Sequence, residues 1–483
     1  MGHTCPRIMI TPFAHQREVV ERTKDTPGWA LFWEQGCGKT KPMLDTAAYL
    51  YRQGKIRGLL VVAPNGVHRN WVTDEVPRHW PPDIPLQTHV YYSGGSKSVS
   101  ARKNAAAALQ TPGMALLAMT YDGFLTKDGR ALAQRFLDTR PCLFVLDEAH
   151  RIKTPGAKRT KALLADAKRA LYRRVLTGTP VANSPFDVYT IMKFLNLDFW
   201  KPFYLDSYFI FKHHFGIFQK GVNRAQGREY EFVVGYRNLE QLEKILAGAS
   251  DRVAKDQVLD LPPKLYSRRY FQLAPPQQRA YNDLRDEFMT FLGSELVTAP
   301  LAITRLLRLQ QVTCGYLPAG DGQPLQDLCE RNPRLELLAE IVEDLAHPAL
   351  VWARFSRDID LIMGLLGDRA VRYDGKVSDE QRAANKEMFQ RGEKQFFVCN
   401  LQINEGLTLT RARTVIYYNN SFKLTDRLQS EDRVHRPGQE HPVNYIDLVA
   451  EETVDEYIVE RLIKKYDIAS TILGDELKGW LRA

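Results

Sequence analysis

A short run of glycines, a lysine and a threonine has the residue types needed to bind phosphate. The segment 34-EQGCGKT-40 follows the apolar run 29-WALFW-33 and precedes a helical pattern. Glycines in such a turn let backbone N–H groups face a phosphate, and the following helix adds the positive end of its dipole. Lys39 would reach the β- and γ-phosphates, and the Thr40 hydroxyl would bind Mg²⁺. The predicted phosphate-binding residues of this P-loop are Gly36, Cys37, Gly38, Lys39 and Thr40.

A pair of carboxylates ends another apolar run, 142-CLFVLDEAH-150. Both should emerge at the carboxyl edge of a parallel sheet, where α/β folds bind ligands. Asp147 suits a Mg²⁺ contact, and Glu148 suits a base that orients the attacking water. A helix N-cap would explain one carboxylate but not two. By itself this segment could be a glycine turn that matches the motif by chance, because Trp33 occupies the first glycine position of the full GxxxxGK[ST] pattern. Together the two motifs predict a nucleoside triphosphatase.

The elements that must position these residues are parallel strands alternating with helices. Short apolar runs recur in two sets, and continuous hydrophobicity is typical of strands covered on both faces. Strands and helices alternate in both sets, which predicts an α/β fold with two doubly wound lobes. The residues from about 186 to 345 read as mostly helical. The predicted strands are 58–65, 114–121, 142–150 and 173–180 in the first lobe, and 349–355, 395–400, 414–420 and 443–449 in the second.

The proline pair of 261-LPPK-264 is the best candidate for a hinge between the lobes, because proline restricts both itself and its predecessor. We therefore expect lobe 1 to span 1–262, with a helical insertion from about 186. Lobe 2 would span 263–483 and remain helical to about 345.

Length and composition are those of an ordinary globular protein with more than one domain. The 483 residues carry a net charge of +9, which permits a phosphate-rich partner without requiring one. No apolar run approaches the roughly 18 residues of a membrane span, and no signal-like N-terminus is present, so we expect neither membrane insertion nor secretion. The six cysteines form no CxxC pair, which favours small hydrophobic fillers in a reducing cytoplasm over a metal site.

Two longer segments resemble the Swi/Snf-type ATPases of the superfamily-two helicases. Residues 174-RVLTGTPVANSPFDVYTIMKFLNL-197 resemble that family's third motif, and 427-RLQSEDRVHRPGQ-439 resembles its sixth. Together with the DEAH box, 61-VVAPNGVHRNW-71, 352-WARFSRDID-360 and 373-YDGKVSDEQR-382, the similarity covers the chain from about Phe13 to about Lys465. The resemblance implies two tandem RecA-like lobes facing each other across ATP, with DNA running across both.

The same resemblance implies further nucleotide-site residues. Gln16 matches the glutamine that reads the adenine edge, and Gln429 lies in register within the sixth motif. Arg433 and Arg436 match arginines presented to the γ-phosphate, where a guanidinium neutralises developing charge. The alternative for these arginines is a surface ion pair. The fifth motif departs from the family, because Ile403 and Asn404 replace its usual glycine pair and only Gly406 remains, with Leu407 and Leu409 in register.

Small polar groups at strand ends are suited to contact phosphate oxygens without reading bases. Each of these residues could instead form a turn or a cap. Trp71 and Trp352 could stack on bases, but their apolar surroundings favour core packing. The predicted nucleic-acid contacts are Asn65, His68, Arg69, Asn70, Thr120 and Tyr121 in the first lobe, and Arg357, Asn400 and Thr408 in the second.

The resemblance implies a DNA-stimulated ATPase that uses ATP and Mg²⁺ and tracks double-stranded DNA without separating its strands. One alternative is a strand-separating DNA or RNA helicase, although such enzymes more often have glycine where this chain has Asp432. Another is an ATP-gated nucleic-acid-binding scaffold, which the altered fifth motif would favour. We expect a monomeric motor of bacterial or viral type in the bacterial or host cytoplasm.

Overall fold

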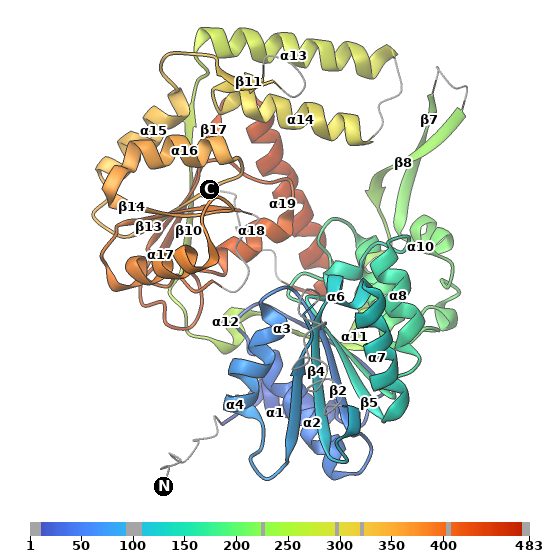
Figure 1. Ribbon diagram of the computed structural model, residues 1–483. Coiled ribbons are helices and arrows are strands. Elements are labelled where there is room, and N and C mark those ends of the chain that lie inside the picture. Colours follow the sequence, from blue (N-terminus) through green and yellow to red (C-terminus); the bar gives the residue numbers. More distant parts are fainter. Residues whose placement is uncertain are drawn as a thin grey trace. The chain divides into compact units, whose positions relative to one another are not determined.

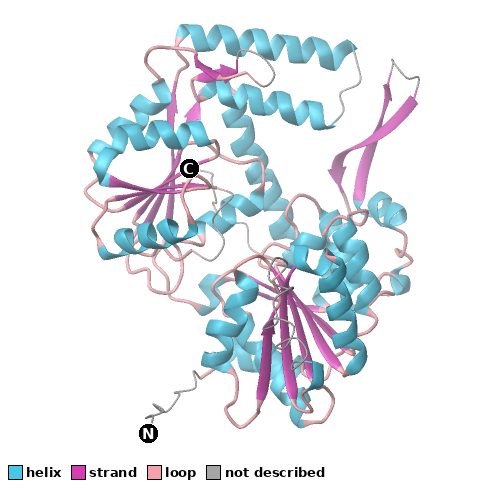
Figure 2. Cartoon of the chain, in the orientation of Figure 1, coloured by secondary structure: helices cyan, strands magenta, loops and turns pink. Residues whose placement is uncertain are grey.

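The computed structural model describes residues 11–92, 109–223, 228–294, 299–318, 323–401 and 407–475. The chain divides into two compact units, each of which is described by itself. The first unit comprises residues 1–216, 236–260 and 468–476, and the second comprises 217–235, 261–467 and 477–483. Figure 1 labels the elements, and Figure 2 shows that each unit places helices around a central sheet.

The first unit is built on a seven-stranded parallel sheet in the order β3-β4-β2-β5-β6-β1-β9. All six residues of β2 and of β5 are buried, which explains why these strands read as continuous apolar runs. The four strands predicted for this lobe are confirmed. The strands are β1 (Gly28–Trp33), β2 (Gly58–Ala63), β3 (Leu86–Val90), β4 (Met114–Thr120), β5 (Cys142–Asp147), β6 (Tyr172–Leu176) and β9 (Ser250–Val253).

Helices cover both faces of this sheet (Figure 1), so the parallel strands are buried between two helical layers. The described helices are α1 (Ala14–Thr23), α2 (Thr40–Arg52), α3 (Val67–Asn70), α4 (Val76–His79), α6 (Tyr121–Leu125), α7 (Lys127–Thr139), α8 (Lys158–Ala167), α9 (Val188–Leu195), α10 (Tyr208–Phe215), α11 (Leu239–Ala247) and α12 (Lys255–Val258).

The second unit is built on a six-stranded parallel sheet in the order β10-β17-β16-β13-β15-β14. The four strands predicted for this lobe are confirmed. The strands are β10 (Lys264–Phe271), β13 (Ala349–Ala353), β14 (Ala370–Tyr373), β15 (Phe396–Asn400), β16 (Thr414–Tyr417) and β17 (Val443–Ala450). The helices are α13 (Pro275–Ser294), α14 (Ala299–Thr313), α15 (Pro333–Glu343), α16 (Ser356–Leu366), α17 (Asp379–Arg391), α18 (Leu424–Glu431) and α19 (Val454–Leu473). The prediction of two doubly wound α/β lobes is therefore confirmed.

The stretch from 186 to 345 contains more strand than its helical appearance indicates. The polar interruption near 220–230 is part of an antiparallel hairpin of β7 (Gly216–Asn223) and β8 (Arg228–Tyr236). The strands β9 and β10 join the edges of the two large sheets, and β11 (Tyr316–Pro318) pairs with β12 (Leu325–Asp327). Edge strands are partly exposed, so they lack the continuous apolar signature of the central ones.

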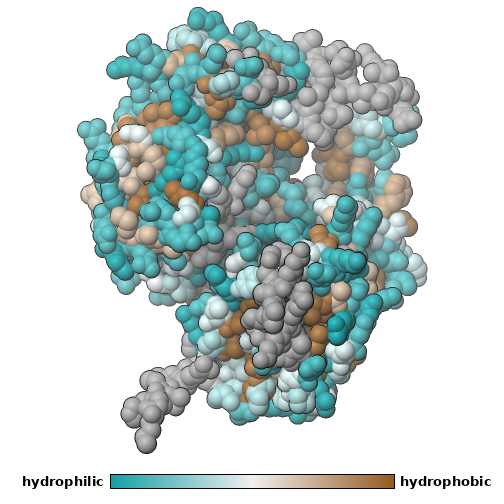
Figure 3. Space-filling model, in the orientation of Figure 1, coloured by the Kyte–Doolittle hydropathy of each residue, from teal (hydrophilic) through white to brown (hydrophobic). Residues whose placement is uncertain are grey.

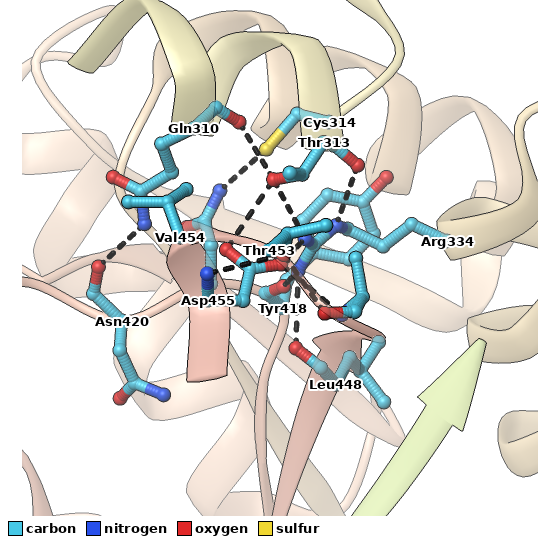
Figure 4. A network of polar contacts seen from close by, with 12 residues as sticks. Gln310, Thr313, Cys314, Arg334, Tyr418, Asn420, Leu448, Thr453, Val454 and Asp455 are labelled. Atoms are coloured by element: carbon cyan, nitrogen blue, oxygen red, sulfur yellow. Dashed lines mark hydrogen bonds and ion pairs between the residues drawn. The ribbon is translucent and has the colours of Figure 1, made fainter. Parts of the chain in front are cut away.

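A buried arginine joins several elements of the second unit (Figure 4). The guanidinium of Arg334, at the start of α15, is fully buried. It donates to the backbone oxygens of Thr313, Tyr418 and Leu448 and pairs with Asp455 at the start of α19. A buried cation needs such a complete set of acceptors to offset its desolvation. Arg334 therefore links two helices and two strand ends to a single point in the core.

Within the part of the chain that the structure describes, none of the helices has both the length and the apolar character that a membrane crossing requires.

Candidate functional site

The glycine turn between β1 and α2 has a backbone that only glycine adopts readily. Gly36 has φ of +90° and Gly38 has φ of +74°. A Cβ on Gly38 would lie 2.3 Å from Nε2 of Gln16, so a side chain there would displace the Gln16 amide from the turn. The turn is therefore shaped by missing side chains, as a phosphate cradle of backbone N–H groups requires.

Lys39 and Thr40 lie where the turn enters α2. The Lys39 ammonium donates to the backbone oxygens of Trp33 (3.0 Å) and Glu34 (3.2 Å), which holds the side chain across the turn. An ammonium has three donors, so one remains for a ligand. Thr40 is the first residue of α2 and is half-buried. The Cys37 side chain is buried, so this residue contributes its backbone rather than its thiol to the turn.

Gln16 connects the start of α1 to the same turn. Its Nε2 donates to the backbone oxygen of Gly38 (3.0 Å), and its Oε1 accepts from the backbone N–H of Phe13 (2.8 Å). A primary amide has two donors and two acceptor lone pairs, so one of each remains for the edge of a base. The position beside the glycine turn fits the predicted role of Gln16 in holding a purine.

The carboxylates predicted to act in catalysis lie at the end of β5, where Asp147 is the last residue of the strand and Glu148 follows it. Burial and the neighbouring Glu148 raise the pKa of Asp147, whereas the Trp71 indole and the Lys39 ammonium lower it. Glu148 has φ of +53°, in the left-handed region, which is unusual for a side-chain-bearing residue and is often found at functional sites. The Glu148 carboxylate accepts from Nε2 of Gln35 (3.1 Å) and lies 3.2 Å from Nδ1 of His150.

A third strand end completes this edge of the sheet. Thr177 follows β6, which lies between β5 and β1, and its Oγ1 is 3.3 Å from Nδ1 of His150. The same Oγ1 accepts from the backbone N–H of Thr179 (3.2 Å). The DEAH segment and the LTGTP segment therefore touch through a hydroxyl and an imidazole. Sequence reasoning found both motifs but did not assign roles to Gln35, His150 or Thr177.

These residues fit a nucleoside triphosphate with Mg²⁺. The positive φ at position 38 favours glycine, the lysine has a donor to spare, and the Gln35 amide joins the turn to the Glu148 carboxylate at 3.1 Å. Thr40 and Asp147 are the residues that would hold the metal, because hydroxyl and carboxylate oxygens are ligands that Mg²⁺ prefers.

The arginines predicted from the sixth motif converge on one short backbone segment of the second unit. Arg433 donates to the backbone oxygen of Gln429 (3.1 Å) and to that of Leu407 (3.4 Å). Arg436 donates to the backbone oxygen of Leu407 (3.2 Å) and to Oγ1 of Thr408 (2.8 Å). Gly406, Ile403 and Asn404 lie outside the described residues. The structure thus brings the end of the fifth motif and the sixth motif together.

Two of the residues predicted to contact nucleic acid in the first unit have buried side chains, which argues against a direct side-chain contact. His68 is 2% exposed and Tyr121 is 1% exposed. The Tyr121 hydroxyl donates to the backbone oxygen of Asp147 (2.7 Å), so it has an internal partner. Both side chains face inward because the short helices that follow β2 and β4 pack against the sheet.

The other predicted contacts of the first unit stay at or near the surface. Asn65 and Arg69 are exposed, and Asn70 is half-buried. The Asn65 side chain accepts from the backbone N–H of Gly66 (3.1 Å), and the Thr120 hydroxyl caps α6 by accepting from the N–H of Gly123 (2.8 Å). The capping alternative for Thr120 is therefore observed, and a role in nucleic-acid contact stays a prediction for these four residues.

The predicted contacts of the second unit each have a protein partner. The Arg357 guanidinium pairs with Asp327 (3.0 Å) and remains partly exposed. The Asn400 side chain donates to the backbone oxygen of Arg354 (3.0 Å), and Thr408 accepts from Arg436. Trp352, like Trp71 in the first unit, is buried, as expected for core packing.

Comparison with known proteins identifies relatives along almost the whole chain. Residues 15–314 match the model of the SNF2-related domain, and residues 333–438 match the helicase conserved C-terminal domain. The chain is 26% identical, over 94% of its length, to the Chromodomain-helicase-DNA-binding protein 1-like of Danio rerio. It is 24% identical, over 91% of its length, to the Transcription regulatory protein SNF2 of Saccharomyces cerevisiae. The chain spans 42% and 26% of these two relatives, respectively.

A solved structure, the Sulfolobus solfataricus SWI2/SNF2 ATPase core in complex with dsDNA, is similar to the chain with a TM-score of 0.41 and 23% identity. The match covers 97% of this chain and 95% of that one.

Proposed function

The chain belongs to the SNF2-related domain family, and from this premise we propose that it is a DNA-stimulated ATPase that hydrolyses ATP to ADP and phosphate while tracking double-stranded DNA. The observation that carries the proposal is the cluster at the carboxyl edge of the first sheet. Three strand ends meet there: the glycine turn with Lys39 after β1, Thr177 after β6, and Asp147 with Glu148 at the end of β5. This is the edge at which α/β sheets bind ligands.

Each residue of the cluster has a role in phosphoryl transfer. The turn and Lys39 would bind the β- and γ-phosphates, and Gln16 would hold the adenine edge. Glu148 would orient the attacking water and accept its proton, and Gln35 and His150 fix the carboxylate for this task. Mg²⁺, held by Thr40 and Asp147, would neutralise phosphate charge. Arg433 and Arg436 would stabilise the transition state, and arginines in this role contribute about 10³–10⁵-fold in rate.

Double-stranded DNA is the proposed partner. The Danio rerio relative is named as a DNA-binding protein, and the exposed Asn65 and Arg69 provide an amide and a cation for phosphate oxygens. Contacts of this kind carry no sequence information, so the proposed motor moves along the duplex without reading it.

The experiment that tests the proposal compares steady-state ATP turnover with duplex DNA, single-stranded DNA, RNA and no nucleic acid. We expect duplex DNA to give the highest rate, because closure on nucleic acid completes the catalytic set in such motors. Equal rates in all four conditions would contradict the proposed stimulation by DNA and would indicate an ATPase whose turnover does not depend on nucleic acid.

A forked duplex separates the proposal from the strand-separating alternative. The proposed translocase hydrolyses ATP on this substrate and releases no single strand. Release of product strands would identify a helicase. Binding of ATP and DNA with no stimulated turnover would instead identify a nucleotide-gated scaffold.

A further inference from the structure

The Asp147 carboxylate is held by a tryptophan from another part of the chain. Nε1 of Trp71 donates to Oδ2 of Asp147 at 2.9 Å, and the Trp71 side chain is only 1% exposed. This is the single hydrogen bond that an indole can donate. Oδ1 of Asp147 accepts from the backbone N–H of Glu148 at 3.0 Å. One side chain and one backbone group thus fix the two oxygens, and the remaining lone pairs are available to a metal.

A second group holds the backbone of the same aspartate. The Tyr121 hydroxyl donates to the backbone oxygen of Asp147 at 2.7 Å, and its side chain is fully buried. Trp71 comes from the helical segment after β2, and Tyr121 begins the helix after β4. Since β2 lies between β4 and β5 in the sheet, both donors reach the end of β5 from the same side.

The backbone around Trp71 is specialised. Residues Trp71–Glu75 form one π-helical turn between α3 and α4. Such turns are rare, occur frequently at functional sites, and re-aim the side chains that follow an α-helical stretch. Asn70 lies immediately before this turn, and Thr120 lies immediately before Tyr121. The two donors to Asp147 therefore each adjoin a predicted nucleic-acid contact.

We propose that Trp71 and Tyr121 are positioning residues that hold Asp147 in the orientation needed to bind Mg²⁺. The inference rests on the proposed function, because it assigns Asp147 to the metal. Hydrogen-bond partners of a metal ligand fix its direction, and their loss typically reduces metal affinity or activity by 10–100-fold. The proposal gives neither Trp71 nor Tyr121 a contact with the nucleotide, so each acts on the metal through Asp147 alone.

The test is equilibrium binding of a fluorescent, non-hydrolysable ATP analogue to the full chain, measured by anisotropy in excess EDTA and again in excess Mg²⁺. The readout is the Mg²⁺-dependent gain, which is the ratio of the two Kd values. For Trp71→Phe we expect Kd in EDTA within about twofold of wild type and a gain reduced by about 10-fold. Tyr121→Phe should also reduce the gain, because it removes the hydrogen bond that holds the backbone oxygen of Asp147.

Trp80→Phe is the matched control. Trp80 is also buried in the first unit, and its Nε1 donates to the backbone oxygen of Ile84 at 2.9 Å. This variant loses an equivalent indole hydrogen bond whose acceptor is the backbone oxygen of Ile84 and not a carboxylate, and we expect it to keep the wild-type gain. Thermal unfolding of all three variants checks that each is folded.

A wild-type gain in folded Trp71→Phe would overturn the role of Trp71, and a wild-type gain in folded Tyr121→Phe would overturn that of Tyr121. An equal loss of gain in Trp80→Phe would also overturn the proposal, because the effect would then be general loosening of the unit. If the wild-type chain itself binds the analogue no better with Mg²⁺ than with EDTA, the proposed function fails, whatever the variants do.

Discussion

Asp147 and Asp358 are two buried carboxylates with raised pKa values, one in each unit. Burial is the main cause for both, but their surroundings differ. Asp147 has a second carboxylate beside it, Glu148, which accepts from Gln35 of the glycine turn. Asp358 accepts from the Tyr316 hydroxyl (2.8 Å) and from the Asn419 amide, inside a closed polar network. A raised pKa therefore marks a functional site only when the neighbouring groups can also perform chemistry.

Lys39→Ala should lower ATP turnover by at least about 10²-fold, since one preorganised donor to a developing charge is commonly worth 10²–10³-fold. Steady-state phosphate release at saturating ATP is the measurement. Lys55→Ala is the control, because Lys55 forms only an exposed pair with Asp25. Turnover close to wild type in Lys39→Ala would refute the phosphate-site assignment, and an equal loss in Lys55→Ala would show that the effect is not specific to the glycine turn.

Asp358→Asn should become relatively more stable as pH rises. Burial raises the pKa of Asp358 from 3.8 to about 6, so the folded state holds this proton more tightly than the unfolded chain. Its contribution to stability is fully present below pH about 4 and is lost as pH rises through 6. The difference between the two values corresponds to about 3 kcal/mol. The asparagine variant has no such proton to lose.

Melting temperatures of wild type and Asp358→Asn, compared at pH 5 and pH 7.5, check this prediction. The melting temperature of the wild type, relative to that of the variant, should fall from pH 5 to pH 7.5. A constant difference would mean that the carboxyl ionises at its ordinary pKa despite its burial.

Elements with both faces buried could be predicted from sequence, and elements at edges could not. β2 and β5 are apolar throughout, because helices cover both faces of the sheet. β10 alternates half-buried and exposed residues over most of its length, and therefore resembles neither a central strand nor a helix. The P-loop and the carboxylates were found because each lies within one contiguous motif. The bond from Trp71 to Asp147 joins residues 76 positions apart, and only the strand order brings them together.

Helix α18, which carries Gln429, is anchored by one buried arginine. Arg427 donates to Glu431 (2.9 Å), Asn420 (2.9 Å) and Asp447 (3.1 Å), and its guanidinium lies 3.5 Å from the Tyr417 ring centroid. Arg427→Met would leave two buried carboxylates without this partner, so we expect a loss of about 3–5 kcal/mol in unfolding free energy. Guanidinium titration of the full chain, variant against wild type, measures it.

Arg391→Met, on helix α17, is the control for Arg427→Met. Arg391 pairs with Glu387 four residues earlier, and both side chains are more than half exposed. Exposed pairs contribute about 0–1 kcal/mol, so this variant should unfold close to wild type. Equal effects of the two substitutions would contradict the anchoring role of Arg427.

At the scale of the whole molecule, a charge of +9 results from 66 basic and 57 acidic residues, so the number of acidic residues nearly equals the number of basic ones. Figure 3 shows a mainly hydrophilic face, with smaller hydrophobic areas scattered over it. Arg357, for example, is already paired with Asp327. Nucleic-acid binding through the predicted contacts would therefore depend more on polar groups and backbone amides than on many free cations.

This composition predicts a shallow salt dependence of duplex binding. Among the nine predicted contact residues only Arg69 and Arg357 are permanent cations, and the buried side chain of His68 cannot reach a phosphate. Each neutralised phosphate contributes about −0.9 to the slope of log K against log salt concentration, so Arg69 alone gives about −1, and the slope reaches about −2 when Arg357 exchanges Asp327 for a phosphate. Anisotropy titrations of labelled duplex across a range of salt concentrations measure it. A flat response would exclude phosphate contacts, whereas a slope steeper than about −5 would require a basic surface outside the predicted set. Arg69→Ala should reduce the magnitude of the slope by about 1, because it removes one counterion-releasing contact.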